Sequence, residues 1–318
     1  MTINLTPVRE LTLSITAPRS AVPQGRPNFL CAASGLVGIE DKFYVVADDE
    51  LSLGIFPVSG DGPGKLFPVF HGELPEHPSE RKEQKPDLEA ITYLSREHFP
   101  PFGAILVVPS GSKPNRFTGG IIPLLKNGEL DQNFRRVDFG PLYNELMQTF
   151  SDLNIEGAVV SDGSLKLFQR GNAHAGKNAI INVSLNGFLE DLLKDGQASA
   201  QRIQSISFFD LGELNGTRLS FTDAALYGEK EIWFLAAAER TESTYDDGEF
   251  CGAAMGTLNL DGSLGKILEL NCPQKPEGLW FTPGHPQREF FVVTDADHPA
   301  RPSVLYRGLI EERLDSTE

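Results

Sequence analysis

Short apolar runs, each followed by a polar loop, recur along the whole chain. The runs contain four or five mostly hydrophobic residues, which is the length of a strand buried in a sheet and too short for a helix. The clearest of them are residues 43–47, 104–108, 165–168, 232–236 and 290–293. Further strands are expected at 120–124, 179–183, 203–209 and 267–270. The pattern predicts an all-β protein built from many short strands.

A five-residue motif precedes each of the clearest strands. It consists of a small or acidic pair followed by the apolar start of a strand, and its five copies lie at 33–37, 88–92, 155–159, 222–226 and 276–280. The second residue of each copy is Ser34, Glu89, Glu156, Asp223 or Glu277, and the third is always Gly or Ala. The intervals between them are 55, 67, 67 and 54 residues, which exceeds the usual repeat of about 40 to 50 residues per propeller blade. We expect the excess to form loops.

These repeats predict one five-bladed β-propeller spanning residues 1–318, with six blades as the alternative and two stacked β-sandwiches as a rival fold. The blades should begin near residues 34, 89, 156, 223 and 277. The last repeat leaves too few residues for four strands. We therefore expect residues 1–16 to close the ring, with Val8, Leu11, Leu13 and Ile15 in the sheet that contains 304–306. Helical insertions are expected at 141–150 and 185–194, on the periphery.

Composition and net charge exclude some classes of function. Hydrophobic residues make up 40% of the chain, enough to bury a sizeable core, and the formal net charge is −16. This balance offers no basic surface for nucleic acid or for an anionic membrane. The three cysteines are scattered, and the first residues lack a basic segment followed by an apolar one. We expect a cytoplasmic protein with buried, inert thiols.

The motifs carry a resemblance to a known group. Residues 34–36 (SGL), 87–92 (DLEAIT), 154–158 (NIEGA) and 276–279 (PEGL) are similar to the motif series of the SdiA-regulated and esterase-like phytase group of β-propellers. The resemblance touches nearly the whole chain at five points, with Ala90 in place of a usual Gly. It implies a propeller fold, calcium binding in some members, and phosphoesterase activity.

A propeller would bring two sets of loops to one face. The loops leading into the inner strands carry Glu89, Glu156, Asp223 and Glu277, and the loops between the second and third strands carry Asp48, Lys113, Arg170, His174, Arg240, Asp295 and His298. Carboxylates that converge on one axis repel one another and need neutralisation. Ca²⁺ is one solution, because it takes six to eight oxygen ligands in irregular geometry. Internal ion pairs with Arg170, Arg240, Lys113, Lys85 and Lys275 are the other.

Two functions remain open from the sequence. The first is metal-dependent hydrolysis of a phosphate or other ester, with Ca²⁺ held by a subset of Glu89, Glu156, Asp223, Glu277, Asp295 and Asp48. In this hypothesis Arg170, Arg240 and Lys113 hold an anionic substrate, and His174 or His298 moves the proton. The second is a non-catalytic propeller that uses the same face to bind a small anionic molecule, a metal ion or another protein. No G-x-S-x-G or H-E-x-x-H motif is present.

Overall fold

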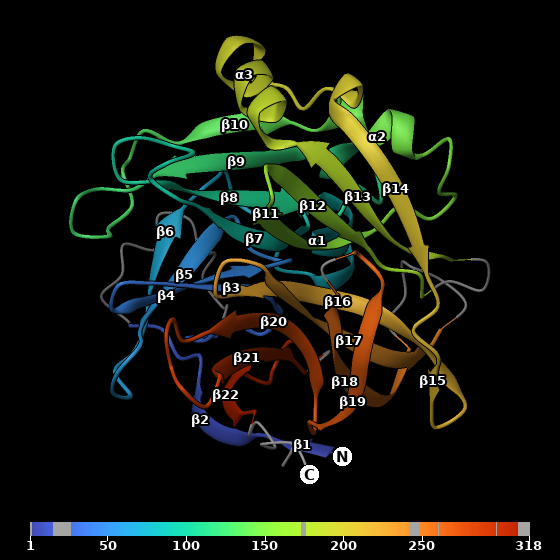
Figure 1. The fold of residues 1–318 in the computed structure, drawn as a ribbon. Coiled ribbons are helices and arrows are strands. Elements are labelled where there is room, and N and C mark those ends of the chain that lie inside the picture. Colours follow the sequence, from blue (N-terminus) through green and yellow to red (C-terminus); the bar gives the residue numbers. More distant parts are fainter. Residues whose placement is uncertain are drawn as a thin grey trace.

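The computed structural model shows a five-bladed β-propeller and describes residues 2–14, 27–172, 176–241, 248–259, 261–296 and 298–310. Figure 1 shows its sheets arranged around a common axis. The inner strands contact one another in the closed order β3, β7, β11, β16, β20 and back to β3. The predicted fold class and the number of blades are therefore confirmed.

The blades follow one another along the chain as antiparallel meanders. Blade 1 contains β3 (Ala33–Ile39), β4 (Lys42–Ala47), β5 (Ser52–Pro57) and β6 (Lys65–Pro68). Blade 2 contains β7 (Leu88–Leu94), β8 (Ala104–Pro109), β9 (Thr118–Pro123) and β10 (Arg135–Asp138). Blade 3 contains β11 (Ile155–Ser161), β12 (Ser164–Gln169), β13 (Asn178–Ser184) and β14 (Ile203–Phe209). Blade 4 contains β15 (Glu213–Leu214), β16 (Thr217–Tyr227), β17 (Glu231–Arg240), β18 (Glu249–Leu258) and β19 (Leu264–Asn271). Blade 5 contains β20 (Lys275–Phe281), β21 (Glu289–Asp295) and β22 (Val304–Leu309).

The hydrophobic core is divided among the interfaces between blades. Each of five clusters of buried residues joins two neighbouring blades. Phe168 of blade 3, for example, makes an edge contact with Phe221 of blade 4, with 5.2 Å between the ring centroids. Burial of apolar side chains between sheets thus holds the ring together, while hydrogen bonds hold each blade.

The N-terminal segment closes the ring, as predicted, by adding the outer strand of blade 5. Strand β2 (Thr6–Glu10) pairs antiparallel with β22, and Thr6 faces Arg307. Of the residues expected in this sheet, Val8 lies in β2, whereas Leu11 and Leu13 lie beyond its end at Glu10. Strand β1 (Thr2–Asn4) pairs parallel with β19 of blade 4, and Leu13 forms a bridge with Gly64, next to β6 of blade 1. Residues 2–14 therefore connect three blades; Ile15 lies outside the described residues.

The described part of the chain contains three short α-helices, two between blades and one within blade 3. Helices α2 (Gly140–Leu146) and α3 (Leu185–Asp195) match the predicted insertions and pack their apolar faces on the core between blades 2 and 3. The third helix, α1 (Pro78–Gln84), precedes β7 and was not predicted. Its seven residues are nearly all polar, so they show no amphipathic period. None of the described helices is long and apolar enough to cross a membrane.

The closing segment should contribute strongly to stability through Leu11. This side chain is 1% exposed and packs in the core between blades 5 and 1, whereas Val8 of the same segment is 42% exposed. We expect Leu11→Ala to lower the free energy of unfolding by about 3 kcal/mol, and Val8→Ala by no more than about 0.5 kcal/mol. Denaturant unfolding monitored by circular dichroism measures both. Equal, small effects would contradict a stabilising role for the closure.

Candidate functional site

Each inner strand contains a β-bulge at its motif. The register of pairing with the second strand shifts by one residue there, and the extra residues are Ser34, Glu89, Glu156, Thr222 and Glu277. A bulge turns its extra side chain away from the regular alternation of the ladder. Four of these side chains, those of Ser34, Glu89, Glu156 and Glu277, line one cavity at the axis.

The fourth repeat departs from the predicted alignment. We expected Asp223 at the position of the three glutamates, but the register places Thr222 there and Asp223 one residue further on. Asp223 is 1% exposed and lies outside the set of described residues that line the axial cavity. Its Oδ2 accepts a hydrogen bond from the backbone N–H of Leu279 in blade 5, at 2.7 Å. Asp223 thus joins two inner strands instead of facing the cavity.

The position after the bulge is where the inner strands approach most closely. A Cβ atom added to Gly35 would lie 2.9 Å from the carbonyl oxygen of Glu89, and one added to Gly278 would lie 2.8 Å from the carbonyl carbon of Gly35. Such contacts leave no room for a side chain. The repeated small residue therefore serves strand packing, and the acidic residue before it faces the cavity.

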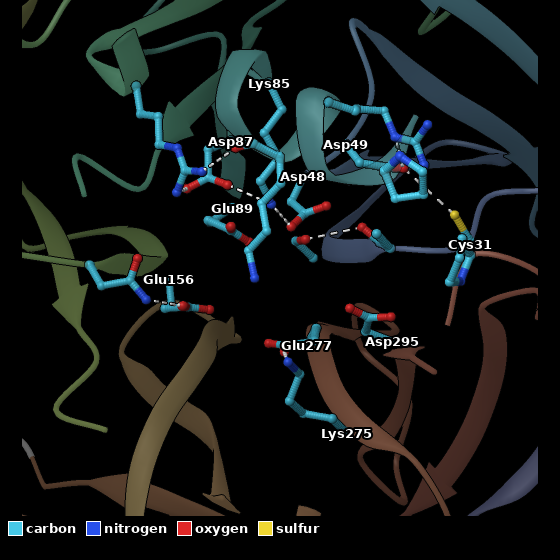
Figure 2. A pocket seen from close by; sticks show the side chains of 18 of the residues that line it. Cys31, Asp48, Asp49, Lys85, Asp87, Glu89, Glu156, Lys275, Glu277 and Asp295 are labelled. Carbon is cyan, nitrogen blue, oxygen red and sulfur yellow. Dashed lines mark hydrogen bonds and ion pairs between the residues drawn. The ribbon is translucent and has the colours of Figure 1, made fainter. Parts of the chain in front are cut away.

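The axial cavity has a volume of about 200 Å³ and is lined almost entirely by polar side chains (Figure 2). Its carboxyl groups belong to Asp48, Asp49, Asp87, Glu89, Glu156, Glu277 and Asp295. Its Lys and Arg side chains are Arg81, Lys82, Lys85, Arg116, Arg170 and Lys275. The loops between second and third strands thus meet the starts of the inner strands on one face, as the sequence predicted.

Lys85 and Asp87 anchor the first ion-pair group of the cavity. The Lys85 ammonium donates to Asp48 and, at 2.7 Å, to Asp87, whose other oxygen accepts from Arg116 at 2.8 Å. Burial opposes the charge of Lys85, but Asp48 and Asp87 outweigh it and raise the pKa of Lys85 well above its usual value. Burial likewise opposes ionisation of Asp87, yet Lys85 and Arg116 hold its pKa below the usual range. Burial raises the pKa of Asp48, the third carboxylate of the group, to about 6, although Lys85 opposes this shift.

Arg170 forms the second group and Lys275 the third. Arg170 donates to Glu156 at 3.2 Å and to Glu239, and Glu156 also accepts from the Asn154 side chain at 2.5 Å. Lys275 lies 3.1 Å from one oxygen of Glu277. Arg81 and Asp49 form a further pair, at 3.2 Å. Several cationic side chains of the cavity are therefore already paired with carboxylates.

Two of the bulged glutamates keep carboxyl oxygens without a partner. Glu89 is 9% exposed, and no described residue forms a hydrogen bond or ion pair with its carboxyl group. Glu277 is 3% exposed, and its Oε2 atom has no hydrogen-bond partner within the described part of the chain. Burial, together with nearby like charges, raises the pKa of both groups well above the usual value. Figure 2 shows both carboxyl groups facing the space at the centre of the cavity.

The remaining predicted site residues divide into three classes. Asp48, Arg170, Asp295 and His298 line the cavity. Arg240 is exposed and pairs with Glu249 at 2.9 Å, and Lys113 is half-buried; neither belongs to the described lining. His174 lies outside the described residues, so its place is open.

Sequence reasoning did not single out Arg81 or Cys31 as cavity residues. Arg81 lies on α1, which was not predicted, and its guanidinium bonds Asp49. Cys31 lies just before β3, with its sulfur 3.8 Å from the carboxylate of Asp49. No pattern in the sequence distinguishes either from an ordinary loop residue, because only the fold of α1 against blade 1 brings them together.

The chain belongs to a family of unknown function, DUF6929, whose pattern matches residues 30–310. No curated protein sequence matches it. Among solved structures, glutaminyl cyclase of Myxococcus xanthus is similar at 10% identity and a TM-score of 0.48, over 98% of this chain and 99% of that one. The mannose phosphorylase MPT-4 of Leishmania mexicana is similar at 12% identity and a TM-score of 0.48, over 96% and 89% of the two chains. A luciferin-regenerating enzyme is similar at 12% identity and a TM-score of 0.40, over 89% and 78%.

Asp223 should give the protein a distinctive pH dependence. Burial raises its pKa well above the usual value, although the N–H groups of Leu279 and Ala224 favour its ionised form. A carboxyl with a raised pKa contributes its full stability below the unfolded-state pKa of about 4 and loses it as the pH rises through the folded-state pKa. We therefore expect Asp223→Asn to unfold at a higher temperature than the wild type at pH 8, by at least about 1 kcal/mol in stability, with the difference vanishing near pH 4.

Asp261 provides a control of opposite sign. It is exposed, and hydrogen bonds from Ser263 lower its pKa, so its contribution is present above the unfolded-state pKa and is lost in acid. Asp261→Asn should therefore be slightly less stable than the wild type at pH 8. Thermal unfolding of both variants from pH 4 to 9 makes the comparison. A loss of stability in Asp223→Asn that is the same at every pH would contradict the protonated, buried carboxyl.

Proposed function

We propose that the axial cavity binds a cation on Glu89, Glu156 and Glu277, with Ca²⁺ as the expected ion, and that this centre hydrolyses a phosphate or other ester. The observation that carries the proposal is the buried Oε2 atom of Glu277, which has no partner among the described residues and lines the same cavity as the carboxyl group of Glu89. Buried polar groups are nearly always satisfied by a partner, water or an ion.

The charge balance favours a cation over an anion. Seven carboxyl side chains and six Lys or Arg side chains line the cavity, and Glu239 adds a further carboxylate behind Arg170. Arg170, expected from the sequence to hold an anionic substrate, is committed to two carboxylates instead. An anion entering the cavity would have to break such a pair, whereas a cation would reduce the excess negative charge.

The donor atoms suit a hard metal ion. The three bulged glutamates supply carboxylate oxygens, and Ser34 adds a hydroxyl at the equivalent position of blade 1. Ca²⁺ prefers oxygen ligands and tolerates irregular geometry. The volume of about 200 Å³ is below the range of about 300 to 1,000 Å³ typical of drug-sized ligands, so an ion with a small substrate group fits it better than a large molecule.

The chain supplies groups that can hold and move a proton beside such an ion. When bound, a divalent cation polarises an ester or phosphoryl oxygen and acidifies a coordinated water. Burial raises the pKa of Glu89 well above its usual value, which favours proton uptake by this carboxyl. His298 lines the cavity, and its Nδ1 accepts the N–H of Ala300, which orients Nε2 as the donor. In this proposal Glu89 takes the proton of the attacking water and returns it to the leaving group, while Nε2–H of His298 donates a hydrogen bond to the leaving-group oxygen.

A non-catalytic role for the same cation is the second candidate. Glu89, Glu156 and Glu277 belong to blades 2, 3 and 5, so one ion that contacts all three would tie three inner strands together. Such an ion would stabilise the ring and create a fixed positive centre for a ligand or protein partner. The distinguishing observation is turnover, since both candidates require the ion.

Calcium should raise the thermal stability of the protein and bind with measurable heat. At one hundred times the dissociation constant, binding to the folded state adds about 2.7 kcal/mol of stability, which excess chelator should remove. We expect Glu89→Gln and Glu277→Gln each to weaken calcium binding at least about tenfold, because each removes a ligand charge. Glu145→Gln, on the exposed side of α2, is the matched control and should bind as the wild type does.

The catalytic half of the proposal has its own test. Calcium-loaded protein is assayed with phosphomonoesters, phosphodiesters, lactones and aryl esters, and Glu89→Gln should reduce any turnover by about 10²-fold or more. Calcium binding without turnover on any of these classes would favour the non-catalytic role. A protein whose calorimetry and melting temperature ignore calcium, magnesium and manganese would contradict the cation site itself.

A further inference from the structure

A second position for a cation lies beside the bulged glutamates, and the protein fills it with its own ammonium group. Asp48, Asp87 and Glu89 each offer a carboxylate oxygen, and these oxygens lie within 4.8 Å of one another. The Nζ atom of Lys85 bonds the first two, at 2.7 Å from Asp87. Figure 2 shows the Lys85 side chain entering this group of carboxylates.

The backbone between α1 and β7 positions the two side chains of one ion pair, those of Lys85 and Asp87. Helix α1 ends at Gln84, Lys85 and Pro86 follow, and Asp87 adopts a positive φ of 58° before β7 begins. The left-handed conformation is costly for a residue with a side chain, so it persists only where the surrounding contacts require it. Here Ser110 and Arg116 hold Oδ2 of Asp87, which leaves Oδ1 for Lys85.

The main chain of the segment is fixed by hydrogen bonds from the loop that follows β8. Arg116 donates to the carbonyl of Lys82 at 2.8 Å, and the Asn115 side chain donates to the carbonyl of Glu83 at 3.0 Å. These bonds hold α1 over the cavity. The side chain of Lys85, in contrast, is a flexible four-carbon stem whose head can move out to water without any change in the helix.

We propose that Lys85 is a built-in competitor, which occupies the cation position of Asp48, Asp87 and Glu89 in the resting protein and must leave when a divalent cation binds. The inference rests on the proposed cation-binding function. Its independent support is the unpartnered Oε2 atom of Glu277, 3% exposed, which faces the same cavity and marks it as incomplete. An ammonium and a divalent ion about 4 Å apart repel by several kcal/mol at the effective dielectric of a partly buried site, so both cannot occupy the group together.

Competition with Lys85 would lower the affinity of the site for a divalent cation without changing the carboxylates that bind it. Removing the positive charge of Lys85 leaves Asp48 without the cation that bonds it and Glu89 without its nearest cationic neighbour. The net attraction for an incoming cation then increases. A purely structural lysine would behave differently, because its loss would loosen the cavity and weaken every ligand.

Calorimetric titration of calcium into chelator-treated wild type and Lys85→Met tests the proposal, since methionine keeps much of the stem and removes the charge. We expect the variant to bind calcium at least about tenfold more tightly than the wild type. Lys166→Met is the matched control. Lys166 bonds Asn182 within blade 3 and does not line the cavity, so this variant should bind as the wild type does.

The outcomes separate this inference from the proposed function. Calcium binding by the wild type with equal or weaker binding by Lys85→Met would overturn the competitor role and leave the cation site intact. Absence of binding in both proteins would overturn the cation site and the competitor role with it. Tight binding by the variant alone would support the competitor role and show that Lys85 excludes calcium from the wild type.

A second variant tests the proposal if Lys85→Met does not fold on its own. The double variant Asp48→Asn with Lys85→Met removes one negative charge together with the positive one, so it should fold without calcium. In differential scanning fluorimetry, calcium should raise the melting temperature of Lys85→Met more than that of the wild type, and the double variant should lose this extra gain. Equal calcium responses in all three proteins would overturn the proposal.

Discussion

The close approach of the five inner strands at the axis is the constraint from which the candidate site follows. Gly35 and Gly278 lie where a neighbouring strand leaves no space for a Cβ atom, and Gly157 lies where a Cβ atom would be in tight contact with blade 4. Each strand accommodates this contact with a bulge, and the bulge directs the preceding side chain into the cavity. A residue that must be small and a residue that faces the axis are therefore adjacent in sequence for a geometric reason. Blade packing fixes the position of the site, and the chemistry depends only on which side chain precedes the small one.

The electrostatics of the cavity follow from that geometry. Side chains directed to one axis from several blades come close together, and Glu89, Glu156 and Glu277 would repel if nothing compensated them. The loops between second and third strands supply part of the compensation, with Arg116 and Arg170 held in two groups of ion pairs. No ion pair reaches Glu89 or one oxygen of Glu277 in the described part of the chain. Burial raises the pKa of both carboxyl groups. The two explanations considered from the sequence, internal pairing and a cation, thus apply to different carboxylates of the same cavity.

The repeat was sufficient to predict the fold because its strands are buried and its motif is tied to strand packing. Five copies of one motif indicate five equivalent blades. The loops between the copies can differ in length without affecting this inference. The same reasoning misplaced Asp223, because matching the acidic residue followed by a small one ignores the ladder register, which puts Thr222 at the bulge. Lys113 and Arg240 show a further limit: the loop to which a residue belongs follows from topology, but the direction of a long side chain on that loop does not. Helix α1 was not predicted because its residues, polar apart from Pro78, are held by tertiary contacts such as those of Arg81 and Arg116.

Ring closure and the candidate site share one stretch of backbone. Leu11 of the closing segment donates its N–H to Ser303 and accepts from Leu30, and Ser303 in turn donates its N–H to Leu30. Two residues beyond Leu30, Ala32 forms a bridge with Asp295 of blade 5 and accepts the N–H of Asp48 of blade 1. The backbone of residues 30–32 therefore contacts both the closing segment and the rim of the cavity between blades 1 and 5. Because Asp48 and Asp295 belong to the first and last blades, their separation depends on the seam of the ring, where N-terminal and C-terminal segments meet. Movement at that seam would change the spacing of these two carboxylates, while Glu89 and Glu156, on the adjacent blades 2 and 3, would keep theirs.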